Sequence, residues 1–125
     1  MRRINITTAS GDAFIAELTC ENPVTAKAVW EKLPIEGKAK TWGDEIYFTI
    51  PVTCNVENPR ELVYVGEVAY WPPGDAICIF FGPTPISGNG EIRPASPVNV
   101  FAKIVNNLKL LKLVRSGEIV RIEKV

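Results

Sequence analysis

The fold is decided by the stretch Leu62–Ser87, LVYVGEVAYWPPGDAICIFFGPTPIS. Its first arm, Val63–Trp71, is rich in β-branched and aromatic residues, and its second arm, Ala76–Phe81, is continuously apolar. Between the arms, two prolines fix φ and remove backbone donors, and Gly74 can adopt positive φ, so the chain must turn there. A hairpin with one arm apolar on both faces belongs at the centre of a sheet or barrel rather than at an edge.

Outside this hairpin, the clearest element is an early helix. Asn22 is a good N-cap and Pro23 suits the first helical position, so the helix is predicted to begin there and to end at Pro34. Apolar residues recur between these points with the spacing of one helical stripe. They are Ala26, Val29, Trp30 and Leu33. A second short helix is predicted in the leucine-rich segment after Asn107.

Several other segments alternate apolar and polar residues or are rich in β-branched residues, which predicts strands. These strands are Ile4–Thr8, Ala13–Leu18, the short segment Ala39–Trp42, Glu45–Val52, Val98–Val105 and Glu118–Val125. The segment Glu36–Lys38 is interpreted as a polar turn. About eight strands with two short helices and no linker predict a single domain over residues 1–125, mainly β, with a closed eight-stranded barrel capped by two short α-helices.

Composition excludes several classes of function. Lys plus Arg equals Asp plus Glu, 14 each, so no general attraction to nucleic acid or to an anionic membrane is expected. The chain has no histidine, which removes the commonest general base and the commonest zinc ligand. Its cysteines are Cys20, Cys54 and Cys78, an odd number without a CxxC motif. This pattern predicts neither disulfides nor a metal site nor a cofactor, and Cys78 is expected to be a small buried residue.

The sequence offers no apolar run near the roughly 18 residues of a membrane span. Met1-Arg2-Arg3 is followed directly by a strand-like segment rather than by the apolar core of a signal peptide. A cytoplasmic location is therefore expected.

The order of these elements resembles that of cyclophilins. Val98–Leu108 resembles the cyclophilin segment that leads into the last helix, with Ala102 where cyclophilins carry glycine. Over nearly the whole chain, the sequence is more similar to a family of small prokaryotic cyclophilin-like proteins. This resemblance rests on the motifs WGDEIYF at 42–48, YWPPG at 70–74 and IFFGPTP at 79–85. It implies an eight-stranded barrel closed by two helices, and no established activity.

The chain departs from the catalytic pattern of cyclophilin isomerases. These enzymes carry an F-H-R stretch whose arginine polarises the prolyl amide, whereas the comparable strand here, Tyr47–Pro51, has neither arginine nor histidine. The main electrostatic contribution to isomerisation is therefore missing from this strand. Arg60 and Arg93 lie on predicted loops beside prolines, and either could in principle supply it.

Two groups of residues are candidates for a ligand site. Aromatic residues and prolines in and after the hairpin could form a groove for a peptide or a flat ligand, or could simply be barrel core with proline-clipped loops. Glu45 and Tyr47 alternate on one strand and could line a pocket, or could face solvent. The predicted ligand-binding residues are Glu45, Tyr47, Trp71, Phe81, Thr84 and Arg93, and no catalytic residue is identified.

Three functions remain open from the sequence. The favoured one is a binding module that takes a small molecule or a proline-containing peptide in a pocket at the barrel. The second is a peptidyl-prolyl isomerase of low activity that uses a relocated arginine. The third, by analogy of fold alone, is a subunit of a larger amide-hydrolysing enzyme, and a protein partner or a homo-oligomer is left open.

Overall fold

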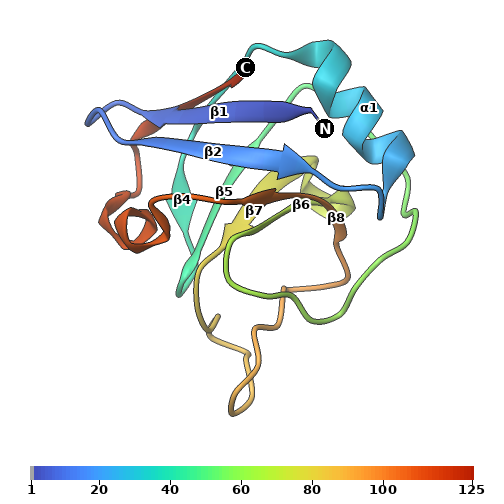
Figure 1. Ribbon diagram of the computed structural model, residues 1–125. Coiled ribbons are helices and arrows are strands. Elements are labelled where there is room, and N and C mark those ends of the chain that lie inside the picture. The colour runs from blue at the N-terminus through green and yellow to red at the C-terminus, as the bar shows by residue number, and fades with distance from the viewer. Residues whose placement is uncertain (1) are drawn as a thin grey trace.

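The central hairpin forms as expected and lies in the middle of the sheet. In the computed structural model, which describes residues 2–125, β6 (Glu67–Trp71) pairs antiparallel with β7 (Ala76–Phe80) across a 3-10 turn at Pro72–Gly74. β6 also pairs with β8 (Asn99–Ile104), and β7 also pairs with β5 (Glu45–Thr49). Both arms are therefore interior strands, as Figure 1 shows.

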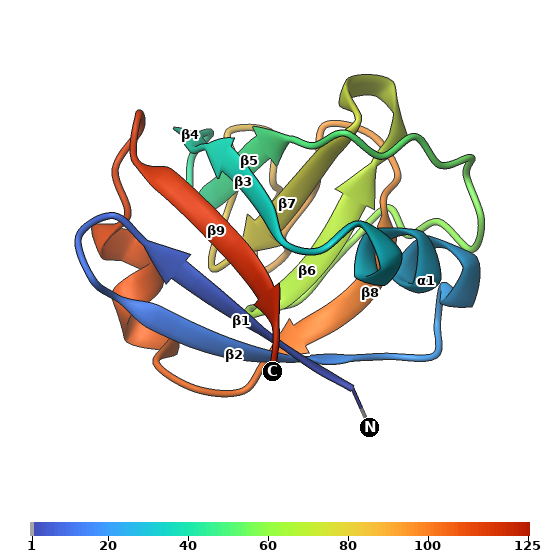
Figure 2. The same cartoon turned by 90° about the horizontal axis from the view of Figure 1, so that it is seen from above.

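The described residues form one antiparallel sheet of nine strands, in the order β3-β9-β1-β2-β8-β6-β7-β5-β4. The remaining strands are β1 (Arg3–Thr8), β2 (Ala13–Leu18), β3 (Ile35–Lys38), β4 (Lys40–Thr41) and β9 (Ile119–Lys124). Its two end strands, β3 and β4, are consecutive in the chain, so the sheet curls round into a nearly closed barrel (Figure 2). The expected barrel of mainly β structure is confirmed.

The number of strands is one more than predicted, because the segment interpreted as a polar turn is strand β3. It pairs with β9 from Ile35 to Lys38. Gly37 suggested a turn, but it has a packing role: a Cβ there would lie 2.5 Å from Cδ2 of Phe48. The glycine lets the Phe48 ring lie directly against this strand.

The early helix α1 spans Pro23–Lys32, and Ala26 and Val29 bury its predicted apolar stripe in the barrel core. Asn22 is the N-cap residue, as predicted, but its side chain makes no capping bond. It donates instead to the carbonyl of Val100 at 2.8 Å. A distant carboxylate replaces the cap: Glu57 accepts from the N–H of Thr25 at 3.0 Å.

The late helix is a 3-10 helix, Leu108–Leu113, rather than the predicted α-helix. Asn107 enters it in the left-handed conformation, with φ of 53°, and of its residues only Leu111 is buried. Neither helix, nor any other in the described part of the chain, has the length and apolar content that crossing a membrane would require.

The central strands are buried on both faces, but by different neighbours. Residues such as Phe48, Tyr70 and Ile77 point into the barrel and form the main core. The residues that alternate with these along the strands point outward. They form a second, smaller core under the loops at 53–66 and 81–98. Its buried members are Val63, Ala69, Cys78, Phe80, Ile92, Val98 and Val100. This second layer is the physical reason that Ala76–Phe80 is apolar on both sides.

Candidate functional site

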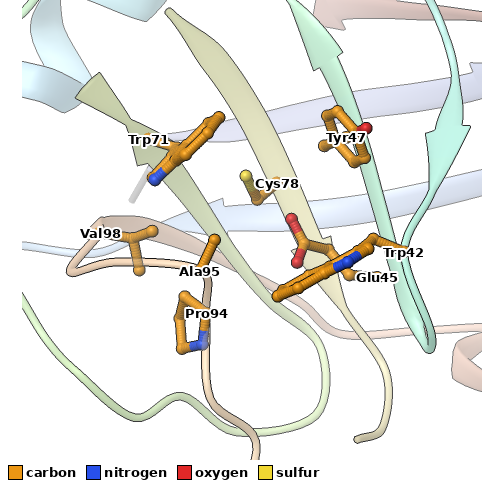
Figure 3. Close-up of a pocket in the computed structure, with 8 residues that line it drawn as sticks. All are labelled: Trp42, Glu45, Tyr47, Trp71, Cys78, Pro94, Ala95 and Val98. Atoms are coloured by element: carbon orange, nitrogen blue, oxygen red, sulfur yellow. The ribbon is translucent and has the colours of Figure 1, made fainter. Parts of the chain in front are cut away.

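A cavity of about 310 Å³ opens at the edge of this outer layer. Strands β5, β6 and β7 form its base, and the loop that precedes β8 closes one side (Figure 3). Its lining residues are Trp42, Glu45, Tyr47, Trp71, Cys78, Pro94, Ala95 and Val98. The volume lies at the lower end of the range for small-molecule sites, and the mostly apolar lining with few polar groups is typical of such sites.

Glu45 is the polar centre of the cavity. The residue is only 5% exposed, and its Oε1 atom is buried without a hydrogen-bond partner. Burial raises the pKa of Glu45 from an ordinary 4.5 to about 7, and the hydrogen bond from the Cys78 thiol offsets only part of this rise. An unsatisfied buried acceptor costs about 1–3 kcal/mol, so this carboxyl group lowers the stability of the folded state.

A tight turn places Glu45 and Trp42 together. The N–H of Trp42 donates to the carbonyl of Glu45 at 3.0 Å, and the N–H of Asp44 donates to the carbonyl of Pro83 at 2.9 Å. Gly43 has φ of +60°, and a Cβ there would lie 2.9 Å from the Pro83 oxygen. The sequence motifs WGDE and GPTP therefore pack against each other, and their contact fixes one wall of the cavity.

The opposite wall is the indole of Trp71. Its Nε1 donates to Oγ of Ser96 at 2.6 Å, which ties the ring to the loop before β8. The ring also lies over Gly74, where a Cβ would come within 2.6 Å of Cζ3. The prediction that Gly74 supplies positive φ is wrong, because Asp75 takes the left-handed conformation with φ of 46°. Gly74 makes room for the indole instead.

Cys78 lies at the base of the cavity, opposite Tyr47 in the β5–β7 register. Its burial is confirmed. Burial, together with the neighbouring Glu45 carboxyl group, raises the pKa of the Cys78 thiol well above its usual range. A thiol in this state is a weak donor and a poor nucleophile.

Three of the six predicted site residues line this cavity: Glu45, Tyr47 and Trp71. The alternative view that Glu45 faces solvent is wrong, because the residue is buried at the start of β5 while that strand pairs with both β4 and β7. Tyr47 is half-buried and packs against the outer core.

The other three predicted residues lie outside the lining. Phe81 is half-buried and packs against the main core. Thr84 is buried, and its hydroxyl donates to the carbonyl of Arg93, which holds the 84–93 loop together. The Arg93 guanidinium pairs with Glu91 at 2.9 Å. The structure therefore separates these three residues from the cavity.

Sequence reasoning missed the remaining lining residues. Trp42 carried a signal, since it begins the unusual WGDE motif, but that motif was used only for resemblance. Cys78 was interpreted as core. Pro94, Ala95 and Val98 carried no signal, because nothing local shows that their loop folds back over the sheet.

The cavity has few ionisable groups in its lining. Among residues 2–125, no basic side chain lines it, and no group of three or more acidic or thiol side chains is arranged to hold a metal. Arg60, one of the two arginines considered for isomerisation, pairs with Glu21 at 2.6 Å and also with Glu67. The site offers aromatic faces and one carboxyl group.

Comparison with known proteins gives a matching family model and matching solved structures. The family model described as Cyclophilin-like matches residues 2–123. The solution structure of the hypothetical protein AF2241 from Archaeoglobus fulgidus is similar, with 46% sequence identity and a TM-score of 0.84. The match covers 99% of this chain and 95% of that one. Among curated proteins, no sequence matches the chain.

Proposed function

The chain belongs to the cyclophilin-like family, and from this premise we propose that it is a binding module whose cavity over β5, β6 and β7 takes a small, largely apolar organic molecule. The observation that carries this proposal is the buried carboxyl group of Glu45, which has an oxygen without a partner inside a cavity walled by aromatic rings. A ligand that donates to Glu45 and fills the apolar space would satisfy both features.

Binding is favoured over turnover by the residues present. Isomerisation of a prolyl bond needs a donor aimed at the prolyl nitrogen as amide resonance is lost. Arg60 and Arg93 are both held in ion pairs away from the lining of the cavity. Nucleophilic chemistry would need an activated group, and burial keeps the Cys78 thiol protonated.

The tryptophans provide a direct test by NMR of the ¹⁵N-labelled protein. The probes are neutral aromatic fragments, indole and 2-naphthol, and a short proline-containing peptide. We expect the indole N–H signals of Trp42 and Trp71 to move saturably with a fragment, while that of Trp30 stays in place. Trp30 is a matched control because it lies on α1, outside this cavity, with Arg2 and Lys124 over its ring.

Two variants sharpen this test. Trp42→Ala should weaken fragment binding at least tenfold, whereas Trp30→Ala should leave it unchanged. Saturable shifts with the peptide alone would replace the small molecule by a peptide ligand. Shifts of Trp30 equal to those of Trp42 and Trp71, or no saturable shift with any probe, would contradict the proposal. The same peptide in a protease-coupled assay tests the isomerase alternative, for which we expect no acceleration.

A further inference from the structure

Resting on the proposed function, we propose that the cavity is a cage for an organic cation, a methylated ammonium or protonated amine group, with Glu45 as its counter-ion. Two independent features of the described residues support this ligand class. One is the set of aromatic walls, and the other is the charge of the groups that face the cavity.

Three aromatic side chains line the cavity together with the carboxyl group. Trp42 comes from the turn before β5, Tyr47 from β5 itself and Trp71 from the end of β6. Figure 3 shows Trp71 on one side of Glu45, and Tyr47 and Trp42 on the other. Aromatic faces carry negative electrostatic potential, and several faces around one point are how proteins recognise ammonium groups that cannot all be satisfied by hydrogen bonds.

The charged groups of the lining also favour a cationic ligand. Glu45 is the acidic residue of the lining, and within residues 2–125 no lysine or arginine side chain lines the cavity to neutralise it. Its Oε1 atom is buried and has no donor. A cation would supply both the missing partner and the missing charge, and a protonated amine would add an N–H donor.

The ionisation of Glu45 couples this binding to pH. The titratable groups that face it are Cys78 from β7 and Tyr47 from its own strand, and neither carries a positive charge. The other elements around the cavity contribute residues that do not titrate: Trp42, Trp71, Pro94, Ala95 and Val98. Because the pKa of Glu45 is about 7 in the empty cavity, protons compete with the cation below that pH.

A pair of probes with the same shape isolates the charge. Choline and 3,3-dimethylbutan-1-ol differ only in whether the central atom is a cationic nitrogen or a neutral carbon. Titration of the full chain, followed by calorimetry and by the Trp42 and Trp71 indole signals, gives both affinities. We expect choline to bind at least about tenfold more tightly than its analogue near pH 8, and to lose most of this preference by pH 5.5 as Glu45 takes up a proton. The neutral probe should show no pH dependence.

Glu45→Gln keeps the shape of the side chain and removes its charge. We expect this variant to bind both probes equally, at the affinity of the neutral one. Glu31→Gln removes an exposed carboxylate on α1 that is remote from the cavity lining and should keep the wild-type preference. The pH series on the wild type tests the same claim without any substitution, so it holds even where a variant folds poorly.

The outcomes separate the two proposals. Equal binding of choline and its neutral analogue, or binding of neutral aromatic fragments with none of choline, overturns the cation cage while the binding function stands. A preference for choline that survives Glu45→Gln also overturns the role of Glu45 as counter-ion. Failure of choline, its analogue and the neutral aromatic fragments alike would remove the binding function itself.

Discussion

Two strands of the central sheet begin with a buried glutamate. Glu45 is at the start of β5, and Glu67 is at the start of β6. They are 5% and 8% exposed. Glu67 accepts from the N–H of Tyr64 at 2.7 Å and pairs with Arg60. Glu45 has a neutral thiol as its polar neighbour and an oxygen with no partner. The two residues are therefore buried to a similar extent, but the carboxylate of Glu67 is paired and that of Glu45 is not.

The two glutamates differ as a structural polar group differs from a binding one. Glu67 and Arg60 satisfy each other inside the fold, and Glu21 adds a second carboxylate to the same guanidinium. The desolvation of Glu67 is thus offset locally. That of Glu45 is not, so the fold is less stable for keeping a carboxyl group there, and a ligand is the natural source of the missing interaction.

The largest expected effect is on the satisfied glutamate. Arg60→Met should lower the free energy of unfolding by about 2–4 kcal/mol, because it leaves Glu67 buried without its cation. Urea unfolding followed by circular dichroism measures the change. The double variant Arg60→Met, Glu67→Leu serves as the control and should recover most of the loss. A change below about 0.5 kcal/mol in the single variant would show that the Arg60–Glu67 pair is not what holds this region.

Substitution of Glu45, the glutamate without a partner, should raise the free energy of unfolding rather than lower it. The folded state holds a proton on Glu45 up to about pH 7, whereas the unfolded chain releases it near 4.5. Between these values the native state binds more protons, so wild-type stability falls as pH rises from 4.5 to 7. Glu45→Gln removes this loss. The variant should match the wild type near pH 4.5 and exceed it by about 1–3 kcal/mol near pH 8.

Urea midpoints at several pH values check this second prediction. Glu31→Gln, on the exposed face of α1, is the control and should show no such pH-dependent gain. A stability difference between Glu45→Gln and wild type that stays constant from pH 5 to pH 8 would mean that Glu45 titrates normally. The contrast between the two buried glutamates would then disappear.

Local pattern predicted most of the fold. The hairpin, the early helix and the principal strands follow from alternation, helical spacing and proline positions, which depend on near neighbours in sequence. What sequence missed depends on distant partners. Gly37 lies in a strand that pairs with β9, where its missing side chain makes room for Phe48. The side chain of Asn22 donates to a carbonyl on β8 and makes no capping bond to its own helix.

The candidate site divides in the same way. Glu45, Tyr47 and Trp71 were found because strand alternation and aromatic content mark them. Pro94 and Ala95 were not found, since their place depends on a loop that folds back across the sheet. The sequence also could not predict how many hydrogen-bond donors reach Glu45, because only the folded structure shows which donors lie near a buried oxygen.

A smaller effect is expected where the cavity wall meets the hairpin turn. Gly74→Ala places a methyl group within 2.6 Å of the Trp71 ring, so the indole must move away from Ser96. We expect a loss of about 1 kcal/mol and an upfield shift of the Trp71 indole N–H as its hydrogen bond breaks. Pro73→Ala, in the same turn but exposed, should leave that signal in place. An unchanged Trp71 signal in Gly74→Ala would contradict this prediction, because it would show that the indole keeps its hydrogen bond to Ser96.

The smallest effect concerns the Cys78 thiol beside Glu45. Burial keeps the Cys78 thiol protonated, so a thiol reagent such as Ellman's should label exposed Cys20 first, half-buried Cys54 more slowly and Cys78 only on unfolding. Cys20→Ser, which removes the fast phase, is the control. Cys78 should remain protected in Glu45→Gln as well, because burial rather than the carboxyl group dominates its pKa. Rapid labelling of Cys78 in the native protein would reveal a thiolate, which makes the site a nucleophile beside an acid instead of an aromatic cage around an unpaired carboxylate.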